Sequence, residues 1–141
     1  MAGYSGTPLA KKLGYKDGFR ICVLNPPENF EQELEVPEEV RVIHSKRKPL
    51  DLILFFTKSQ ASLRKDFSAL AKKLSPAGML WISWPKQASG VTTDLNENIV
   101  RQIGLDAGLV DVKVCAINEV WSGLKFVYRL KDRAVTNVHP G

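Results

Sequence analysis

The chain has 141 residues, of which 44% are hydrophobic, and it carries 20 Lys and Arg against 15 Asp and Glu. A chain of this length buries roughly two thirds of its unfolded surface, so we expect one domain and exclude the small scaffolds held together by disulfides or metals. No apolar run approaches the ~20 residues that span a bilayer, and the chain does not open with a basic segment followed by an apolar one, so we expect a cytoplasmic protein without membrane contact.

The cysteines and histidines form no ligand cluster. Cys22 and Cys115 lie far apart in apolar runs, and His44 and His139 are equally isolated. A metal site needs three or four converging ligands, so we predict no metal and two buried, reduced thiols.

The first third of the chain predicts three strands and a short helix. Residues 19–25 are rich in branched apolar side chains and stop at two prolines, which indicates a buried strand. A short acidic helix is expected through Phe30 and Leu34, followed by strands over 40–44 and 51–56. The last strand is apolar on both faces, which indicates cover on both sides of the sheet.

A helix is predicted between Thr57 and Ser75, where apolar residues recur at helical spacing. Thr57 with Gln60 resembles a capping box, and Ser59 is an alternative cap. Residues 75–78 are expected to end this helix, and a fourth strand is predicted over 79–84.

Asp94 and Glu97 form a second capping-box pattern, which predicts a helix that ends near Gly108. Two extended segments between Val112 and Leu130 then predict a hairpin, with its turn at 121–123. We expect one α/β domain over residues 1–131 and a flexible tail over 132–141.

Strands that alternate with helices predict a three-layer, mostly parallel, Rossmann-like α/β sheet that ends in an antiparallel hairpin. The connection from His44 to Asp51 is too short for a helical crossover, so the second and third strands must flank the first. Numbered along the chain, the predicted strand order is 2-1-3-4-6-5.

This pattern resembles a trimmed Rossmann-like methyltransferase core: residues 51–56 resemble its fourth strand, and residues 76–82 the entry to its fifth. A closer resemblance covers nearly the whole chain and is to an uncharacterised bacterial family, domain of unknown function 3052. It is carried by the opening segment 3–14, by Trp84-Pro-Lys86 and by the segment 111–127. That family has no established activity to carry over.

Two departures from the methyltransferase pattern predict that no cofactor is bound. The turn after the first strand is Asn25-Pro26-Pro27-Glu28-Asn29 instead of a glycine-rich loop, so two amide donors are missing and a carboxylate is added. His44-Ser45 stands at the end of the second strand, where an acidic residue should hold the ribose hydroxyls. We therefore expect a chain that is not an active S-adenosylmethionine-dependent methyltransferase.

Ligands of open α/β sheets bind at the carboxyl ends of the strands, near the point where the strand order reverses. The candidate ligand-binding residues at this edge are Asn25, Trp84, Lys86 and Ser89. Trp121 either covers the end of the sheet or stacks on a ligand. No serine has a His/Asp relay and no G-x-S-x-G motif occurs, so we predict no catalytic residues.

The leading hypothesis from the sequence is a non-catalytic Rossmann-like domain that binds a protein partner or a small anionic ligand. The alternative is an enzyme with an unrecognised site at the carboxyl edge of the sheet. A second alternative is a weak nucleic-acid binder. This last reading rests on charge alone, because six acids fall within residues 28–39 and leave the rest of the chain basic, with Lys46-Arg47-Lys48 as its densest run.

Overall fold

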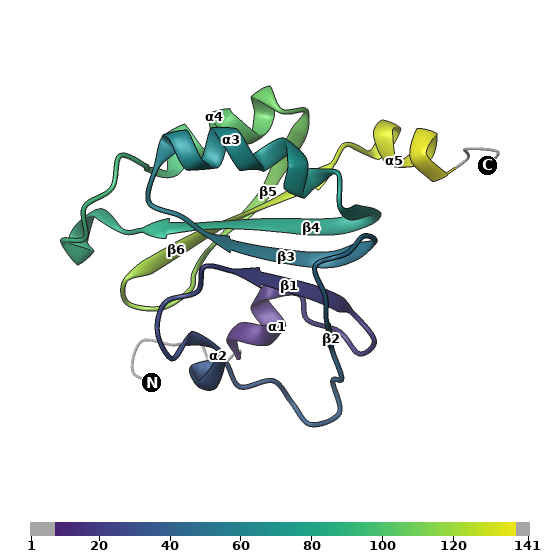
Figure 1. Ribbon diagram of the computed structural model, residues 1–141, viewed down its shortest axis with the longest axis horizontal. Helices are drawn as coiled ribbons and strands as arrows, with labels where there is room; N and C mark the ends of the chain where they lie inside the picture. The colour runs from purple at the N-terminus through teal and green to yellow at the C-terminus, as the bar shows by residue number, and fades with distance from the viewer. Residues whose placement is uncertain (1–7, 138–141) are drawn as a thin grey trace.

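The computed structural model describes residues 8–137, which form helices on both faces of a six-stranded sheet (Figure 1). The strands are β1 (Arg20–Leu24), β2 (Ile43–His44), β3 (Leu50–Phe56), β4 (Leu74–Pro85), β5 (Leu109–Ala116) and β6 (Trp121–Tyr128). The helices are α1 (Leu9–Leu13), α2 (Phe30–Glu33), α3 (Gln60–Ala71), α4 (Glu97–Asp106) and α5 (Leu130–Asn137), with a 3-10 turn η1 (Gln87–Ser89) after β4. In Figure 1, α3 and α4 cover one face of the sheet, and α1 and α2 lie on the other.

The strand order β2-β1-β3-β4-β6-β5 confirms the predicted topology. β1 pairs in parallel with both β2 and β3, and β3 pairs in parallel with β4. β6 is antiparallel to β4 and to β5. The short segment 45–49 holds no crossover helix, so β2 and β3 lie on opposite sides of β1.

Alternate side chains of β3 enter two separate cores. Ile53 and Phe55 pack in the cluster beneath α3 and α4, whereas Leu52, Leu54 and Phe56 pack in the cluster on the α1 and α2 side. All five are at most 2% exposed. This burial on both faces confirms the two-sided cover that the apolar run 51–56 predicts.

A buried hydrogen bond attaches α1 to the middle of the sheet. The indole Nε1 of Trp81, a fully buried residue of β4, donates to the carbonyl oxygen of Leu13 at 2.8 Å. Leu13 is the last residue of α1, and Gly14 follows it in the left-handed conformation, with φ of 99°. The bond therefore satisfies a carbonyl at the helix end that has lost its helical partner.

Two strands differ in length from the prediction. β2 has only two residues and pairs only with Arg20 and Ile21, so residues 40–42 lie outside it. β4 is longer, because the segment expected to end the preceding helix continues the strand and Leu74 pairs with Leu50.

The cap of α3 is the predicted alternative Ser59, whereas the cap of α4 differs from the prediction. Ser59 caps α3, accepting from the Ser62 amide at 3.1 Å, and Asn96 caps α4, accepting from the Ile99 amide at 2.9 Å. The predicted cap Asp94 instead accepts from the amide of Gln60 at 2.8 Å. Its carboxylate therefore stabilises the start of α3 and not of α4.

The hairpin turn precedes the predicted one. The turn begins at Asn118, whose side-chain oxygen stabilises it by accepting from the amides of Val120 and Trp121, each at 2.9 Å. Residues 121–123 are the first residues of β6. Beyond the hairpin, α5 forms a helix over part of the predicted tail, while residues 138–141 lie outside the described range.

Close packing of α4 on the sheet depends on the missing side chain of Gly104. A Cβ atom there would lie 2.0 Å from Cε1 of Phe126. Phe126 cannot easily move away, since it is fully buried and its ring packs edge-to-face on Phe67, with centroids 5.2 Å apart.

We predict that Gly104→Ala lowers the free energy of unfolding by about 2 kcal/mol, because overpacking outweighs the roughly 1 kcal/mol of helix propensity that alanine adds. Urea denaturation measures the difference. Ser68→Ala, at an exposed position of α3, is the control and should change stability by less than about 0.5 kcal/mol. An equally stable or more stable Gly104→Ala variant would show that the ring of Phe126 gives way.

Candidate functional site

The carboxyl ends of β1 and β3 open into a cavity of about 460 Å³, here called the edge cavity. Strand order reverses at β1, and ligands of open α/β sheets bind at such a point. The lining residues come from the turn after β1, the end of β3, the start of α3 and the start of β6: Asn25, Pro26, Pro27, Phe56, Thr57, Lys58, Ser59, Ser62 and Trp121.

The turn after β1 contains no glycine, yet its backbone adopts conformations that glycine favours. Asn25 has φ of 55° and Asn29 has φ of 67°, both in the left-handed region. Asparagine tolerates this region better than most residues because its short polar side chain bonds locally. Glu28, expected to place a carboxylate in the site, is exposed and does not line the edge cavity.

The aromatic wall of the edge cavity is rigid. Trp121 packs edge-to-face on Phe56, with ring centroids 5.1 Å apart, and Phe56 packs similarly on Phe30 at 4.9 Å. Trp121 is 8% exposed. It therefore covers the end of the sheet and also faces the cavity, and stacking on a ligand stays a prediction.

The four predicted ligand-binding residues do not meet at one site. Asn25 lines the edge cavity, whereas Trp84 and Lys86 line a different cavity of about 400 Å³ beside the start of α4. Trp84 is 4% exposed and belongs to the core beneath α3 and α4. The Ser89 hydroxyl is used within its own loop, because it donates to the Lys86 carbonyl at 2.6 Å and accepts from the Val91 amide at 3.1 Å.

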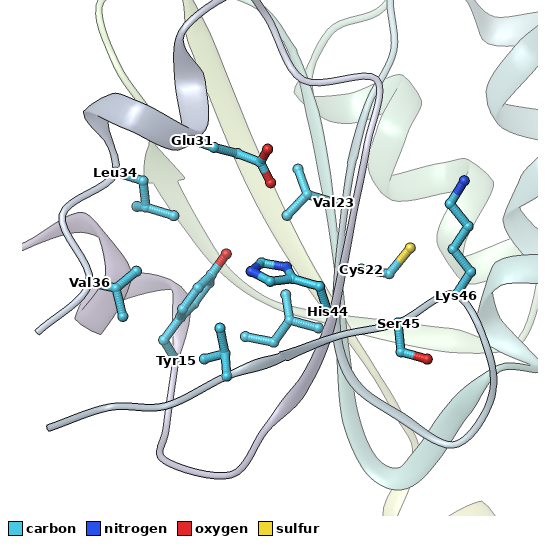
Figure 2. Close-up of a pocket in the computed structure, with 11 residues that line it drawn as sticks. Tyr15, Cys22, Val23, Glu31, Leu34, Val36, His44, Ser45 and Lys46 are labelled. Atoms are coloured by element: carbon cyan, nitrogen blue, oxygen red, sulfur yellow. The ribbon is translucent and has the colours of Figure 1, made fainter. Parts of the chain in front are cut away.

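A larger cavity, about 610 Å³, lies beside β1 and β2 (Figure 2). We call it the crossover cavity, because the connection from β1 to β2 forms part of its wall. Its lining residues are Tyr15, Ile21, Cys22, Val23, Glu31, Leu34, Val36, Val42, His44, Ser45 and Lys46. In Figure 2 the Tyr15 hydroxyl, the His44 ring and the Glu31 carboxylate point toward one another.

Burial changes the acidity of two groups in the crossover cavity. Desolvation, with a smaller contribution from the charge of Glu31, raises the pKa of Tyr15 from 10.0 to about 12. Desolvation also raises the pKa of the Cys22 thiol, although Lys73 and Lys46 partly oppose it. At neutral pH Tyr15 is therefore a protonated phenol and Cys22 a poor nucleophile.

Sequence reasoning did not single out Tyr15 or Glu31 as site residues, whereas it did place Thr57 and Lys58 at the carboxyl edge of the sheet, where both line the edge cavity. Glu31 belongs to an acidic run that predicts an exposed helix, and Tyr15 precedes the first strand without a motif. Only His44-Ser45 carried a signal, since the pair stands where the methyltransferase pattern has an acid. These residues come together through the path of the crossover, which local patterns do not specify.

Within residues 8–137, no group of three His, Cys, Asp or Glu side chains is arranged to hold a metal ion. Cys22 and Cys115 are buried free thiols, as predicted. No helix in the same range combines the length and apolar character needed to cross a bilayer.

No family model matches the sequence, and no curated protein does. Several solved structures with a similar fold are methyltransferases. The magnesium protoporphyrin IX methyltransferase of Synechocystis PCC 6803, with bound S-adenosylmethionine, has a TM-score of 0.55 and 11% identity over 86% of this chain and 74% of that chain.

A methyltransferase from Aquifex aeolicus has a TM-score of 0.54 and 15% identity, covering 84% of this chain and 86% of the other. Precorrin-6y C5,15-methyltransferase from Geobacter metallireducens GS-15 has a TM-score of 0.52 and 8% identity, covering 86% of each. The chain has the Rossmann-like methyltransferase fold. At these identities the likeness concerns the fold.

The comparisons correct the functional hypothesis drawn from the sequence. The expectation of a non-catalytic domain that is not an active methyltransferase is wrong, because the similar structures are methyltransferases, one with S-adenosylmethionine and another with S-adenosylhomocysteine bound. The expectation relied on the two prolines and Glu28 in the turn after β1 and on His44-Ser45 at the end of β2. Glu28 is exposed and does not line the edge cavity, whereas both prolines do.

We predict that Glu31→Gln lowers the pKa of Tyr15 but leaves it above 10.0, since burial is the larger cause of the shift. NMR titration of carbon-labelled tyrosine follows each phenol separately. Because the folded pKa lies above the unfolded one, the unfolded state ionises first, and the free energy of unfolding should fall as pH rises from 10 to 12. Glu33→Gln is the control and should leave the pKa of Tyr15 unchanged.

Proposed function

We propose that the chain is an S-adenosylmethionine-dependent methyltransferase that binds its cofactor in the edge cavity. The observation that carries the proposal is the position of this cavity, at the carboxyl ends of β1 and β3, in a fold whose similar structures bind the cofactor. When bound, S-adenosylmethionine would supply a methyl group on a sulfonium: a nucleophilic atom of an acceptor would bond to the methyl carbon as the carbon–sulfur bond breaks, leaving S-adenosylhomocysteine.

The charges and rings of the edge cavity fit the methionine part of the cofactor. Lys58 is exposed at the start of α3, so its ammonium is available to the cofactor's carboxylate. The ring of Trp121 suits the sulfonium, because aromatic faces attract cations. The side-chain amide of Asn25 and the hydroxyl of Ser62 add hydrogen-bonding groups.

The lining of the edge cavity also explains how a turn with two prolines is compatible with the proposal. Pro26 and Pro27 cannot donate backbone hydrogen bonds, so side chains must replace the amides of a glycine-rich loop. The lining includes four hydroxyl or amide side chains besides Lys58, namely Asn25, Thr57, Ser59 and Ser62. The hydroxyls of Ser59 and Thr57 already accept from the amides of Ser62 and Ser59, which leaves Asn25 and Ser62 as the hydrogen-bonding residues to test.

Membership in domain of unknown function 3052 and a cytoplasmic location remain proposals. They rest on the sequence segments 3–14, 84–86 and 111–127 and on the absence of a membrane-spanning pattern. Weak, salt-dependent nucleic-acid binding and association with a protein partner or a small anionic ligand also stay predictions.

We predict that S-adenosylhomocysteine binds the protein with a micromolar dissociation constant and that Lys58→Ala weakens binding roughly tenfold, since a charge-assisted hydrogen bond contributes about 1.5–3 kcal/mol. Isothermal titration calorimetry measures both constants. Asn25→Gly, which keeps the left-handed backbone and removes the amide, should also weaken binding.

Lys65→Ala is the matched control, because Lys65 is an exposed lysine of α3 that does not line the edge cavity. Its affinity should equal that of the unmodified protein. Absence of binding at millimolar S-adenosylhomocysteine, or equal losses in the Lys58 and Lys65 variants, would contradict the proposal.

A further inference from the structure

The connection from β1 to β2 leaves the sheet incompletely covered. Parallel strands are usually joined by a crossover helix that packs on the sheet. Here the connection spans residues 25–42, and its helix α2 has only four residues. The crossover cavity lies beside this connection, since Leu34, Val36 and Val42 line it together with residues of β1.

The wall of the crossover cavity is mainly apolar. Ile21 and Val23 of β1 form one part of it, and Leu34, Val36 and Val42 of the connection form another. A volume of about 610 Å³ lies within the range of small-molecule sites, which are mostly apolar with a few polar groups in fixed positions.

Tyr15 contributes a hydroxyl to the crossover cavity. Its side chain is buried, with 7% of the residue exposed, and its hydroxyl faces the cavity (Figure 2). This hydroxyl makes no hydrogen bond to the described residues. It is open to the cavity, because no side-chain oxygen or nitrogen in the described range is both cut off from solvent and unpaired. A ligand in the cavity can therefore make a hydrogen bond to it directly.

Two further polar groups face the Tyr15 hydroxyl from other elements: Glu31 comes from α2 and His44 from β2. A carboxylate, a phenol oxygen and a neutral imidazole nitrogen can all accept a hydrogen bond from one ammonium group. Lys46, the cation that lines the cavity, projects on the far side from these three groups in Figure 2.

The charge around the crossover favours a cation as well. Residues 28–39 carry six glutamates, all exposed: Glu28, Glu31, Glu33, Glu35, Glu38 and Glu39. Their charges favour a positively charged ligand beside this connection, while Lys46, which also lines the cavity, opposes them.

We propose that the crossover cavity binds a small apolar amine. Its ammonium group would lie among Glu31, Tyr15 and His44, and its apolar body would pack against Ile21, Val23 and Leu34. The two cavities share no lining residue. His44 stands where the methyltransferase pattern has its ribose-binding acid, so the amine is tested both without and with S-adenosylhomocysteine.

The test uses three probes of similar shape and different charge: phenethylamine, phenethyl alcohol and hydrocinnamate. Each is titrated into the full-length, isotope-labelled protein, once without and once with millimolar S-adenosylhomocysteine, and NMR shifts locate the bound probe. We expect phenethylamine to bind and to shift the signals of Tyr15 and His44. The alcohol should bind roughly tenfold more weakly, and the carboxylate more weakly still, because each loses charge-assisted hydrogen bonds.

Two variants test whether the Glu31 carboxylate and the Tyr15 hydroxyl contribute to the affinity for phenethylamine. Glu31→Gln and Tyr15→Phe should each weaken phenethylamine binding severalfold, and both keep the size of the side chain. Glu33→Gln removes a charge from the same helix but does not line the cavity, so its affinity should be unchanged.

Four results would overturn the proposal: no binding of phenethylamine at millimolar concentration, equal binding of all three probes, equal losses in the Glu31 and Glu33 variants, or shifts confined to the edge cavity. Because the probes are titrated with and without S-adenosylhomocysteine, failure of the methyltransferase proposal is measured separately.

Discussion

Burial of β3 on both faces is the constraint on which the rest of the structure depends. An apolar strand of this kind is stable only when both faces of the sheet are covered. On one face α3 and α4 provide the cover, and Gly104 lets α4 approach closely enough to contact Phe126. On the other face the cover is thinner, because α1 has five residues and α2 has four. The bond from Trp81 to the carbonyl of Leu13 anchors α1 there.

Unequal cover also explains where the cavities lie. β1 occupies the point where strand order reverses, so the connections after β1 and β3 depart toward opposite faces and leave the edge cavity between them. The crossover cavity arises from the short helix in the connection to β2. The two cavities differ in charge, since Lys58 lines the first and Glu31 faces the interior of the second. They therefore suit different ligands, a carboxylate-bearing cofactor in one and an amine in the other.

Much of the fold could be predicted because its signals are local. Branched apolar runs, helical spacing and a connection too short for a crossover were enough for the strand order. Competing local signals misled the finer assignments. Both Asp94 and Asn96 are good cap residues, and only the approach of the two helix starts decides that Asp94 serves α3. Similarly, both Asn118 and Ser122-Gly123 favour turns, and the pairing of Gly123 with β4 and β5 places the turn at Asn118.

The sequence by itself determined the sheet order, the two-sided burial of β3 and the absence of a glycine-rich turn, because each depends on residue type and spacing along the chain. Tertiary structure decided how the candidate site residues are grouped. Asn25 and Trp121 line the edge cavity, whereas Trp84 and Lys86 line another. Tyr15 and His44 both line the crossover cavity, because of a connection whose path no local pattern specifies. It also decided the backbone at Asn25 and Asn29. The left-handed φ angles of these two residues follow from the positions of β1 and α2, which the turn must connect. Residue type sets only the conformational energy of a left-handed backbone, which is lower for asparagine than for most residues.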